Sequence, residues 1–207
     1  MILHPSQFPK IEIPLDKVLA RLGYARGKTR VDAATQEAID REIQAAARLI
    51  ASKQVIASSP VKAAAPDRIS LEPDLVIKSV KIYELLKDCS EAYGFAVTIG
   101  PHLEEKRNAY LQEKETNRAL ILDAVGSVMA EELAAITHRQ IKDLAKAKGM
   151  DTTMRFSPGY GDWALSEQKD FLRWLGAGTI GIKLTPSYQM LPEKSVSAII
   201  GITKGRE

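Results

Sequence analysis

The segment that decides the fold class is SVSAIIGIT, at residues 195–203. It is rich in isoleucine and valine, and such β-branched residues favour strands because their stiff side chains pack well on a pleated surface. Before it, Ile180–Leu184 and the extended residues 187–190 predict a second strand, and Pro192-Glu193-Lys194 predicts the turn between the two. The end of the chain is therefore predicted to form an antiparallel hairpin.

Working inward, the middle of the chain predicts helices. Between His102 and Gly149 there is no proline and only one other glycine, Gly126, which indicates close packing or clearance for a ligand. We expect two successive helices here, with the break near Lys114–Asn117. A buried strand is expected just before them, over Gly94–Gly100. Helices in the middle followed by strands at the end indicate the α+β class.

The N-terminal third predicts a short strand and two helices. Ile11–Ile13 alternates as a strand does, Leu15–Leu22 predicts a helix, and Asp32 is placed to cap a second helix that runs to about Ser52. Residues 53–68 are rich in alanine, serine and proline. We expect them to form an extended connection across the surface rather than a linker, which leaves residues 1–207 as one domain.

Two shorter helices are predicted from their capping residues. Ser79 is placed to cap a helix that runs to Cys89. Ser166 is placed to cap another that runs to Leu175, with Gly176 as its end.

The composition is that of an ordinary globular protein. The chain has 207 residues and a formal net charge of +3, with its basic residues spread along the sequence. This distribution argues against a nucleic-acid-binding surface. The N-terminus lacks the pattern of a signal peptide and no apolar run reaches membrane-spanning length, so we expect a cytoplasmic protein without membrane contact.

Residues that usually hold metals are sparse. Cys89 is the only cysteine, which excludes an intrachain disulfide and a multi-cysteine zinc site and makes a buried, inert thiol the expectation. His4, His102 and His138 lie far apart, without the spacing of metal ligands. We therefore expect no metal site.

The most informative motif is RFSPGYGD, at residues 155–162. Proline presets φ and glycine tolerates positive φ, so the backbone is expected to reverse tightly here and to expose its N–H and C=O groups. Arg155 precedes this turn and offers a planar fork of donors that suits a carboxylate. Taken alone, the motif fits a ligand-binding turn and a surface turn with a solvated arginine equally well.

Further segments give the motif a context. KLTPSYQMLP at 183–192 and KSVSAIIG at 194–201 follow it, and AVTIG at 96–100 and LDAVGS at 122–127 precede it. In this order, over roughly residues 75–203, they resemble the activation domain of cobalamin-dependent methionine synthase. That family carries an Arg-x-(Ala/Ser)-Pro-Gly-Tyr signature, a Leu-Thr-x-Ser segment and a Pro-x-x-Ser-Val-Ser strand. The resemblance implies a bent antiparallel sheet flanked by helices.

The resemblance also implies a binding site for S-adenosylmethionine. Arg155 would pair with the methionine carboxylate of this ligand, and the adenosyl part would meet backbone groups and a ring from Ser157, Gly159 and Tyr160. The acid that would bind the ligand's ammonium group stays open among Asp16, Glu131, Glu132 and Asp162. We expect the turn and the segment Leu184–Met190 to line one open cleft, with walls from Tyr160, Trp163 and Tyr188. Core packing is the alternative role for these aromatic residues, above all for Trp163.

In this family the domain serves reactivation. The cobalamin of the synthase occasionally oxidises, and a methyl group from S-adenosylmethionine with an electron from a reductase restores it. The resemblance implies that this chain holds the methyl donor, contributes no catalytic residue, and meets cobalamin only through its partner protein. The zinc-binding cysteines and the Asp-x-His-x-x-Gly cobalt ligand of the whole synthase are not in this sequence. We therefore do not expect the chain to methylate homocysteine by itself.

The sequence is shorter than the family domain, because it ends soon after residues 195–203. It fits a stand-alone subunit for a methionine synthase that lacks its own activation domain. Two alternatives stay open: a reactivation factor for another corrinoid methyltransferase, and a non-catalytic small-molecule-binding or scaffold protein.

Overall fold

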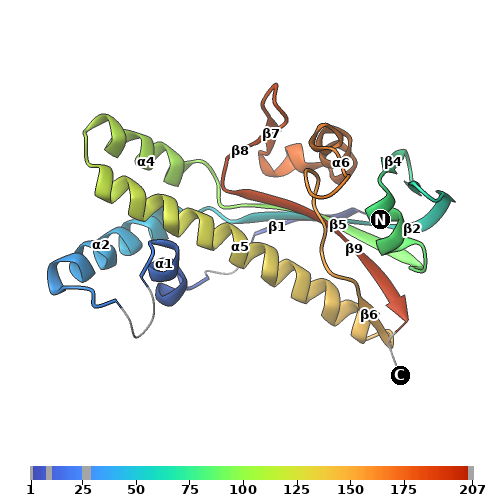
Figure 1. Cartoon of the computed structure of the whole chain (residues 1–207), viewed down its shortest axis with the longest axis horizontal. Helices are drawn as coiled ribbons and strands as arrows, with labels where there is room; N and C mark the ends of the chain where they lie inside the picture. The colour runs from blue at the N-terminus through green and yellow to red at the C-terminus, as the bar shows by residue number, and fades with distance from the viewer. Residues whose placement is uncertain (1, 8–10, 25–28, 205–207) are drawn as a thin grey trace.

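The computed structural model describes residues 2–7, 11–24 and 29–204, and its elements are labelled in Figure 1. The first half of the chain contains β1 (Ile2–Gln7), α1 (Leu15–Arg21), α2 (Ala33–Leu49), β2 (Lys53–Ala65), β3 (Arg68–Leu71), β4 (Leu75–Lys78), α3 (Val80–Leu86) and β5 (Glu91–Thr98). The second half contains α4 (His102–Gln112), α5 (Thr116–Lys146), β6 (Met150–Thr152), η1 (Leu165–Glu167), α6 (Gln168–Leu175), η2 (Ala177–Ile180), β7 (Lys183–Leu184), β8 (Met190–Leu191) and β9 (Ser195–Lys204).

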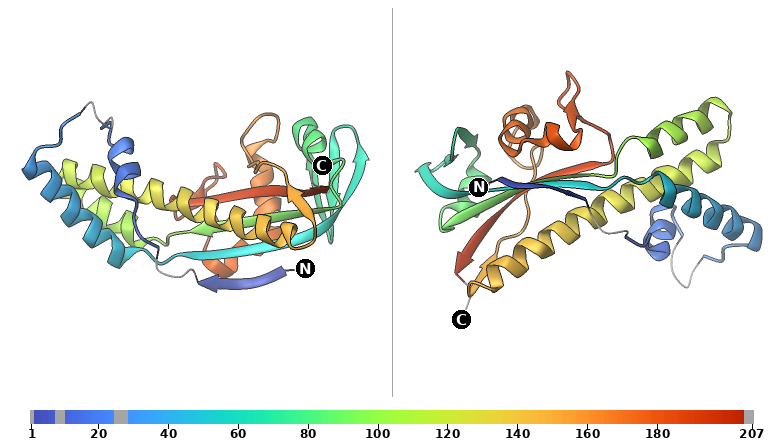
Figure 2. Two further views of the ribbon diagram at one scale, coloured as in Figure 1. Left: turned by 90° about the horizontal axis from the view of Figure 1, so that it is seen from below. Right: turned by 180° about the vertical axis from the view of Figure 1, so that it is seen from behind.

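The main sheet is antiparallel and has the strand order β4-β3-β2-β5-β9-β6. One edge of the long strand β2 is shared, because β1 pairs with its first part and β3 with its last part. Figure 2 shows β2 curving as it passes from the first partner to the second. The result is a bent antiparallel sheet, as expected.

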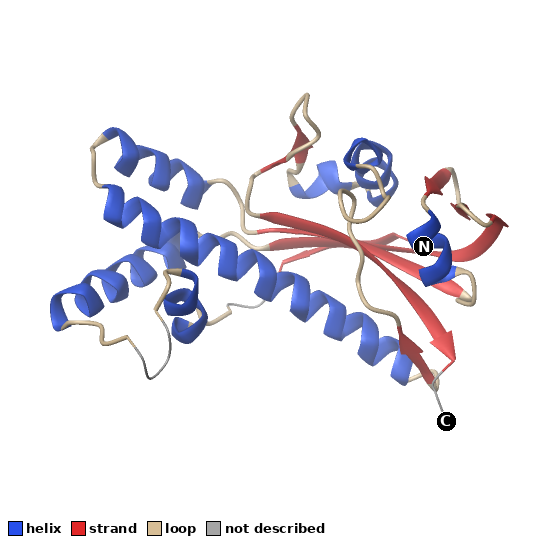
Figure 3. Cartoon of the chain, in the orientation of Figure 1, coloured by secondary structure: helices blue, strands red, loops and turns tan. Residues whose placement is uncertain are grey.

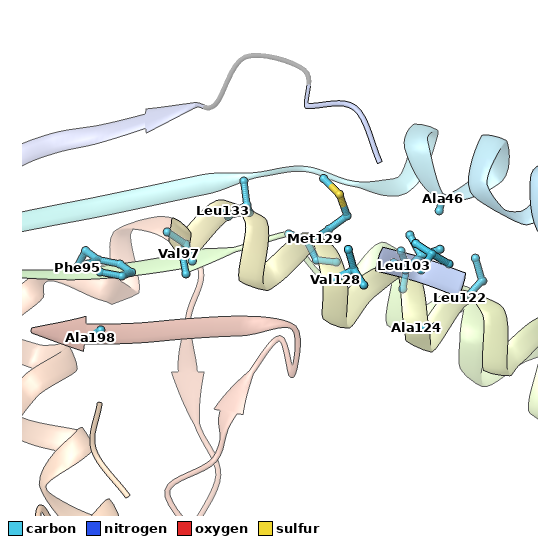
Figure 4. Packing of buried hydrophobic residues seen from close by; sticks show 14 of the residues in the cluster. Ala46, Phe95, Val97, Leu103, Leu122, Ala124, Val128, Met129, Leu133 and Ala198 are labelled. Carbon is cyan, nitrogen blue, oxygen red and sulfur yellow. The ribbon is translucent and has the colours of Figure 1, made fainter. Parts of the chain in front are cut away.

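Helices cover both faces of the sheet, as Figure 3 shows. On one face α5 packs with α1, α2 and α4, and Figure 4 shows Leu133 of α5 near Val97 of β5. On the other face α3 and α6 build a second core around Trp163 and Phe171. Successive residues of β9 serve the two cores in turn, so Ala198 belongs to the first core and Ile199 to the second.

Several sequence predictions are confirmed. α4 and α5 are separate helices, with the break at residues 113–115. Asp32 caps α2 by accepting the Thr35 N–H at 2.9 Å, and Ser79 caps α3 by accepting the Ile82 N–H at 3.0 Å. Gly176 ends α6 in the left-handed region, at φ 68°. The α+β class and the flanked antiparallel sheet are also as predicted.

The predicted terminal hairpin is wrong. Among the described residues β7 pairs only with β8, whereas β9 pairs with β5 along its length and with β6 at its end. The expected strand at Ile180–Leu184 shrinks to Lys183–Leu184, because η2 occupies Ala177–Ile180 and Gly181 takes a φ of 89°. Both differences have one cause. The backbone hydrogen bonds of β9 are made with the distant strand β5, so the chain just before β9 does not have to pair with it and can form short turns.

Three predictions for the first third of the chain also need correction. Ile11–Ile13 is not a strand, and α2 ends at Leu49 instead of near Ser52. Residues 53–65 are not a surface connection but the strand β2 between β5 and β1/β3, with Val55 and Ala57 buried. Small side chains made this segment resemble a linker, yet small residues also suit a strand that is covered on both faces.

One capping prediction in the last third is also wrong. Ser166 lies inside η1, and α6 begins without a side-chain cap.

Candidate functional site

The motif turn, residues 155–162, is attached to the edge of the sheet at β9. In Figure 1 its chain crosses β9 on the way from β6 to α6. Phe156 and Ile199 exchange two backbone hydrogen bonds, of 3.0 and 2.8 Å, which fix the start of the turn to β9. Gly159 takes a φ of 90° and donates to the carbonyl of Trp163 at 2.8 Å. Positive φ favours glycine at this position, as the sequence predicted.

Asp162 fixes the other end of the turn. Its carboxylate accepts hydrogen bonds from the Ser79 hydroxyl at 2.6 Å and from the Val80 and Lys81 N–H groups at 2.7 and 3.2 Å. The Ser79 hydroxyl, helped by the two backbone donors, holds the pKa of Asp162 below its usual value. This carboxylate therefore caps the N-terminus of α3. It is no longer a candidate for binding the ligand's ammonium group.

A cleft of about 480 Å³ opens beside the turn. It is bounded by Met154–Pro158 and Tyr160, by Glu131 of α5, by Gln168 of α6, by Met190 of β8, and by Ser195–Ser197 of β9. Of the segment Leu184–Met190, which was expected to line the cleft together with the turn, only Met190 is a lining residue. The cleft lies where α5, β9 and the turn meet, at the edge of the sheet.

Arg155 and Glu131 face each other in this cleft. The Arg155 Nη2 atom lies 2.5 Å from a carboxylate oxygen of Glu131. The Nη1 atom of Arg155 is buried and has no hydrogen-bond partner among the described residues. Buried donors in native proteins are almost always paired, so an unpaired guanidinium nitrogen on a residue that borders a cleft is unusual.

The other residues proposed from sequence divide between cleft and core. Ser157 and Tyr160 line the cleft, and Tyr160 is 69% exposed. Gly159 shapes the turn without lining the cleft. Trp163 is 1% exposed and packs edge-on against Phe171, with ring centroids 5.2 Å apart, so it belongs to the core and is not a cleft wall. Tyr188 is not among the lining residues either, although its carbonyl accepts the Gln168 amide at 2.6 Å.

Of the four carboxylates considered from sequence, only Glu131 borders this cleft. Glu132 forms an ion pair with Lys17 at 2.5 Å, and Asp16 is exposed in the first turn of α1. The sequence could not rank these acids because their distances from the turn depend on how α1 and α5 pack.

Sequence reasoning missed several residues of the site. Gln168 and Met154 carry no motif of their own, and the Ser195–Ser197 segment was recognised as a strand of the family but was not assigned to the site. A second cavity of about 500 Å³ shares Glu131, Ser195 and Val196 with the cleft and extends toward α1. Gly126 lies on this side, where a Cβ atom would be 3.1 Å from Lys194 Cγ, so its role is close packing.

The described residues contain neither a metal-binding cluster nor a membrane-spanning helix. No group of three or more His, Cys, Asp and Glu side chains within residues 2–7, 11–24 and 29–204 is arranged to hold a metal ion. Within the same ranges, no helix has the length and apolar character needed to cross a membrane.

Comparisons with known proteins agree with the fold. The structure is similar to one described as the crystal structure of the MetH reactivation domain bound to AdoHcy, with a TM-score of 0.67. The match covers 99% of this chain and 80% of that one, at 16% sequence identity. No curated protein matches the sequence. The fold is therefore that of a reactivation domain.

A family model identifies the chain more closely. Residues 82–205 match the model described as vitamin B12 dependent methionine synthase, activation domain. The chain belongs to this family.

Proposed function

We propose that this chain binds S-adenosylmethionine in the cleft and presents its methyl group to the oxidised cobalamin of a methionine synthase that lacks its own activation domain. The observation that carries the proposal is the buried, unpaired Nη1 of Arg155 beside Glu131. The family and the AdoHcy-bound structural relative support the same ligand class.

The pair Arg155 and Glu131 suits the amino-acid end of this ligand. A guanidinium binds a carboxylate through charge-assisted hydrogen bonds, and Nη1 of Arg155 has no partner among the described residues. Glu131 is an acceptor for the ammonium group, which lies one carbon atom away from the carboxylate in any α-amino acid. The ion pair between the two side chains holds both in place before the ligand arrives.

The adenosyl end would lie against the motif turn. Ser157 and Tyr160 line the cleft there, and Gly159 gives the turn its shape. Tyr160 is exposed and offers an apolar ring with a polar tip, a combination that suits a sugar or a flat base. We keep Tyr160 as the aromatic wall of the site, in place of Trp163.

The task of the chain is then to position the methyl donor. An electron-donating reductase would first reduce the partner's cobalt(II) by one electron. The S-adenosylmethionine held by this chain would then give its methyl group to the reduced cobalt and leave as S-adenosylhomocysteine. This chain would hold the ligand at both ends in an open cleft that the partner can reach. Holding two reactants in line is a large part of what a protein contributes to such a transfer.

Equilibrium binding tests the ligand. Titration calorimetry of the purified chain with S-adenosylmethionine and with S-adenosylhomocysteine should give one site per chain for each. Cobalamin alone should show no tight stoichiometric binding. A folded chain that binds neither adenosyl compound would overturn the proposal.

A further inference from the structure

One edge of β9 is open beside the cleft. Ile199 directs its backbone N–H and C=O toward Phe156, and the Gly201 carbonyl accepts the Thr153 N–H at 2.9 Å. Both residues therefore point away from β5, on the opposite edge of the strand. Because backbone groups alternate along an antiparallel strand, Ser197 must direct its own N–H and C=O the same way.

Nothing in the described part of the chain pairs with Ser197 on that edge. The neighbouring segment leaves β9 after Phe156, where the motif turn begins, and β6 meets β9 only at residues 202–204. Ser197 is buried and borders the cleft, and its backbone groups lie on the edge of β9 that faces the motif turn. Buried backbone donors and acceptors need partners, and a ligand in the cleft would be one.

The open edge offers a specific pattern of hydrogen bonds. One strand residue presents a donor and an acceptor side by side, pointing in the same direction. The edge of adenine presents the complementary pair, a ring nitrogen that accepts and a 6-amino group that donates. Met190, Phe156 and Val196 border the same cavity and supply apolar surface for the faces of a flat base.

We propose that Ser197 recognises the adenine base of the bound ligand, its N–H donating to a ring nitrogen and its C=O accepting from the 6-amino group. This inference rests on the proposed function, since it assigns the base end of the same ligand whose amino-acid end meets Arg155. The cleft then recognises both ends of the ligand. Arg155 and Glu131 bind its charged amino-acid end, and the edge of β9 distinguishes its base.

The test uses the wild-type chain and two ligands that differ only at the base. S-inosylhomocysteine carries a 6-oxo group in place of the 6-amino group of S-adenosylhomocysteine, so an acceptor would face the Ser197 carbonyl. We expect calorimetry to show binding of the inosyl compound that is weaker by about tenfold or more, because a buried polar group would lose its partner. Equal affinity for the two compounds would overturn the assignment while leaving the proposed function standing. Binding of neither compound would overturn both.

A pair of proline variants tests the backbone donor directly. Ser197→Pro removes the outward N–H from an edge position, where proline is best tolerated in a sheet. Val76→Pro is the matched control: it lies on the edge strand β4, and its N–H also points outward, as that of Lys78 does toward Glu167. We expect Ser197→Pro to weaken binding of S-adenosylhomocysteine at least about tenfold and Val76→Pro to leave it unchanged. A folded Ser197→Pro chain with wild-type affinity would contradict the inference, and if that variant does not fold, the inosyl comparison decides.

Discussion

At the scale of single residues, Arg155 carries most of the functional argument. Its side chain is 32% exposed and that of Glu131 is 59% exposed, so their ion pair is worth little in stability. A pair that contributes little to folding but leaves a buried donor unpaired is better explained by binding than by structure. The ligand would add an acceptor where the free protein has none.

Removing this side chain should weaken binding selectively. We expect Arg155→Ala to reduce affinity for S-adenosylhomocysteine by about 1.5–3 kcal/mol, the value of a charge-assisted hydrogen bond. Arg155→Lys should recover only part of the loss, because an ammonium cannot form the planar fork. Calorimetry and a circular dichroism spectrum on the same samples would measure both affinity and fold.

A smaller ligand supplies the control for that prediction. 5′-Methylthioadenosine has the nucleoside but neither carboxylate nor ammonium, so Arg155→Ala should not change its affinity. Arg173→Ala removes an exposed arginine that pairs with Asp74 and Asp170, and it should change neither affinity. An equal loss for both ligands in Arg155→Ala would mean that the arginine only supports the turn.

Glu131 makes a parallel prediction for the ammonium group. Glu131→Gln should weaken binding of S-adenosylhomocysteine by about 1–2 kcal/mol, since the amide cannot offer a charged acceptor. Glu132→Gln changes the adjacent residue, which pairs with Lys17 instead, and should leave affinity within about twofold of wild type. Reversed behaviour of the two variants, measured by calorimetry, would move the ammonium site to Glu132.

Part of the site was predictable at this scale. The Pro-Gly turn and the charge of Arg155 are properties of neighbouring residues, so the sequence alone pointed to them. Glu131 was one of four candidate acids and could not be ranked among them, because its place depends on the packing of α5. Ser197 was not identified, because its role depends on which strand edges are paired. The sequence left Trp163 open between cleft wall and core, since a motif aromatic and a core aromatic look alike in sequence.

At the scale of secondary-structure elements, predictions that depend on neighbouring residues were mostly correct, whereas the predicted strand pairing was wrong. Caps, glycine ends and the break between α4 and α5 are set by neighbouring residues. The pairing of β9 with β5 joins residues about a hundred positions apart, from Glu91↔Ile202 to Thr98↔Ser195. No local pattern distinguishes this register from the hairpin that the sequence predicted.

The packing of α6 on β5 gives a stability prediction. A Cβ atom on Gly94 would lie 2.5 Å from Trp174 Cζ3 and 3.0 Å from Leu175 Cδ2, so the ring would have to move. We expect Gly94→Ala to lower the free energy of unfolding by about 1–3 kcal/mol, as overpacked cores do. Gly178→Ala is the control, because nothing lies within 4 Å of its Cβ position. Urea denaturation that finds both variants equally stable would contradict this account of the packing.

His138 on α5 gives a pH prediction. Burial, and then the charges of Arg155 and Lys142, hold the pKa of His138 below its usual value of 6.5. The unfolded chain therefore binds a proton here before the folded one does, so this histidine should make the fold lose stability as the pH falls through about 6.5. His138→Gln should reduce that loss in urea denaturation between pH 8 and pH 5.5. A pH dependence identical to wild type would show that other groups cause it.

At the scale of the whole molecule, the architecture explains why the site is open. The bent sheet is covered by helices on both faces, but the cleft lies at its edge, between α5 and the motif turn. Two residues that line the cleft are largely exposed, Met154 at 70% and Tyr160 at 69%. A methyl donor held there is within reach of a large group carried by another protein, which a closed pocket would exclude.

The α+β class and the bent, flanked sheet were predictable because composition and periodicity limit the choice, and the family resemblance narrowed it further. The strand order was not, since β2 looked like a connection and its two partners on one edge lie far apart in sequence. The position of the cleft follows from that strand order, and so it became visible only in three dimensions.

The central claim is that this chain restores an oxidised synthase, and a reconstitution tests it most directly. A methionine synthase from the same source, lacking its own activation domain and inactivated in the cobalt(II) form, would be mixed with a reductant and S-adenosylmethionine, with and without this chain. Absorbance spectra would follow the return of methylcobalamin, with Arg155→Ala as the matched variant. We predict recovery only when the wild-type chain is present. Equal recovery with and without it would contradict the account.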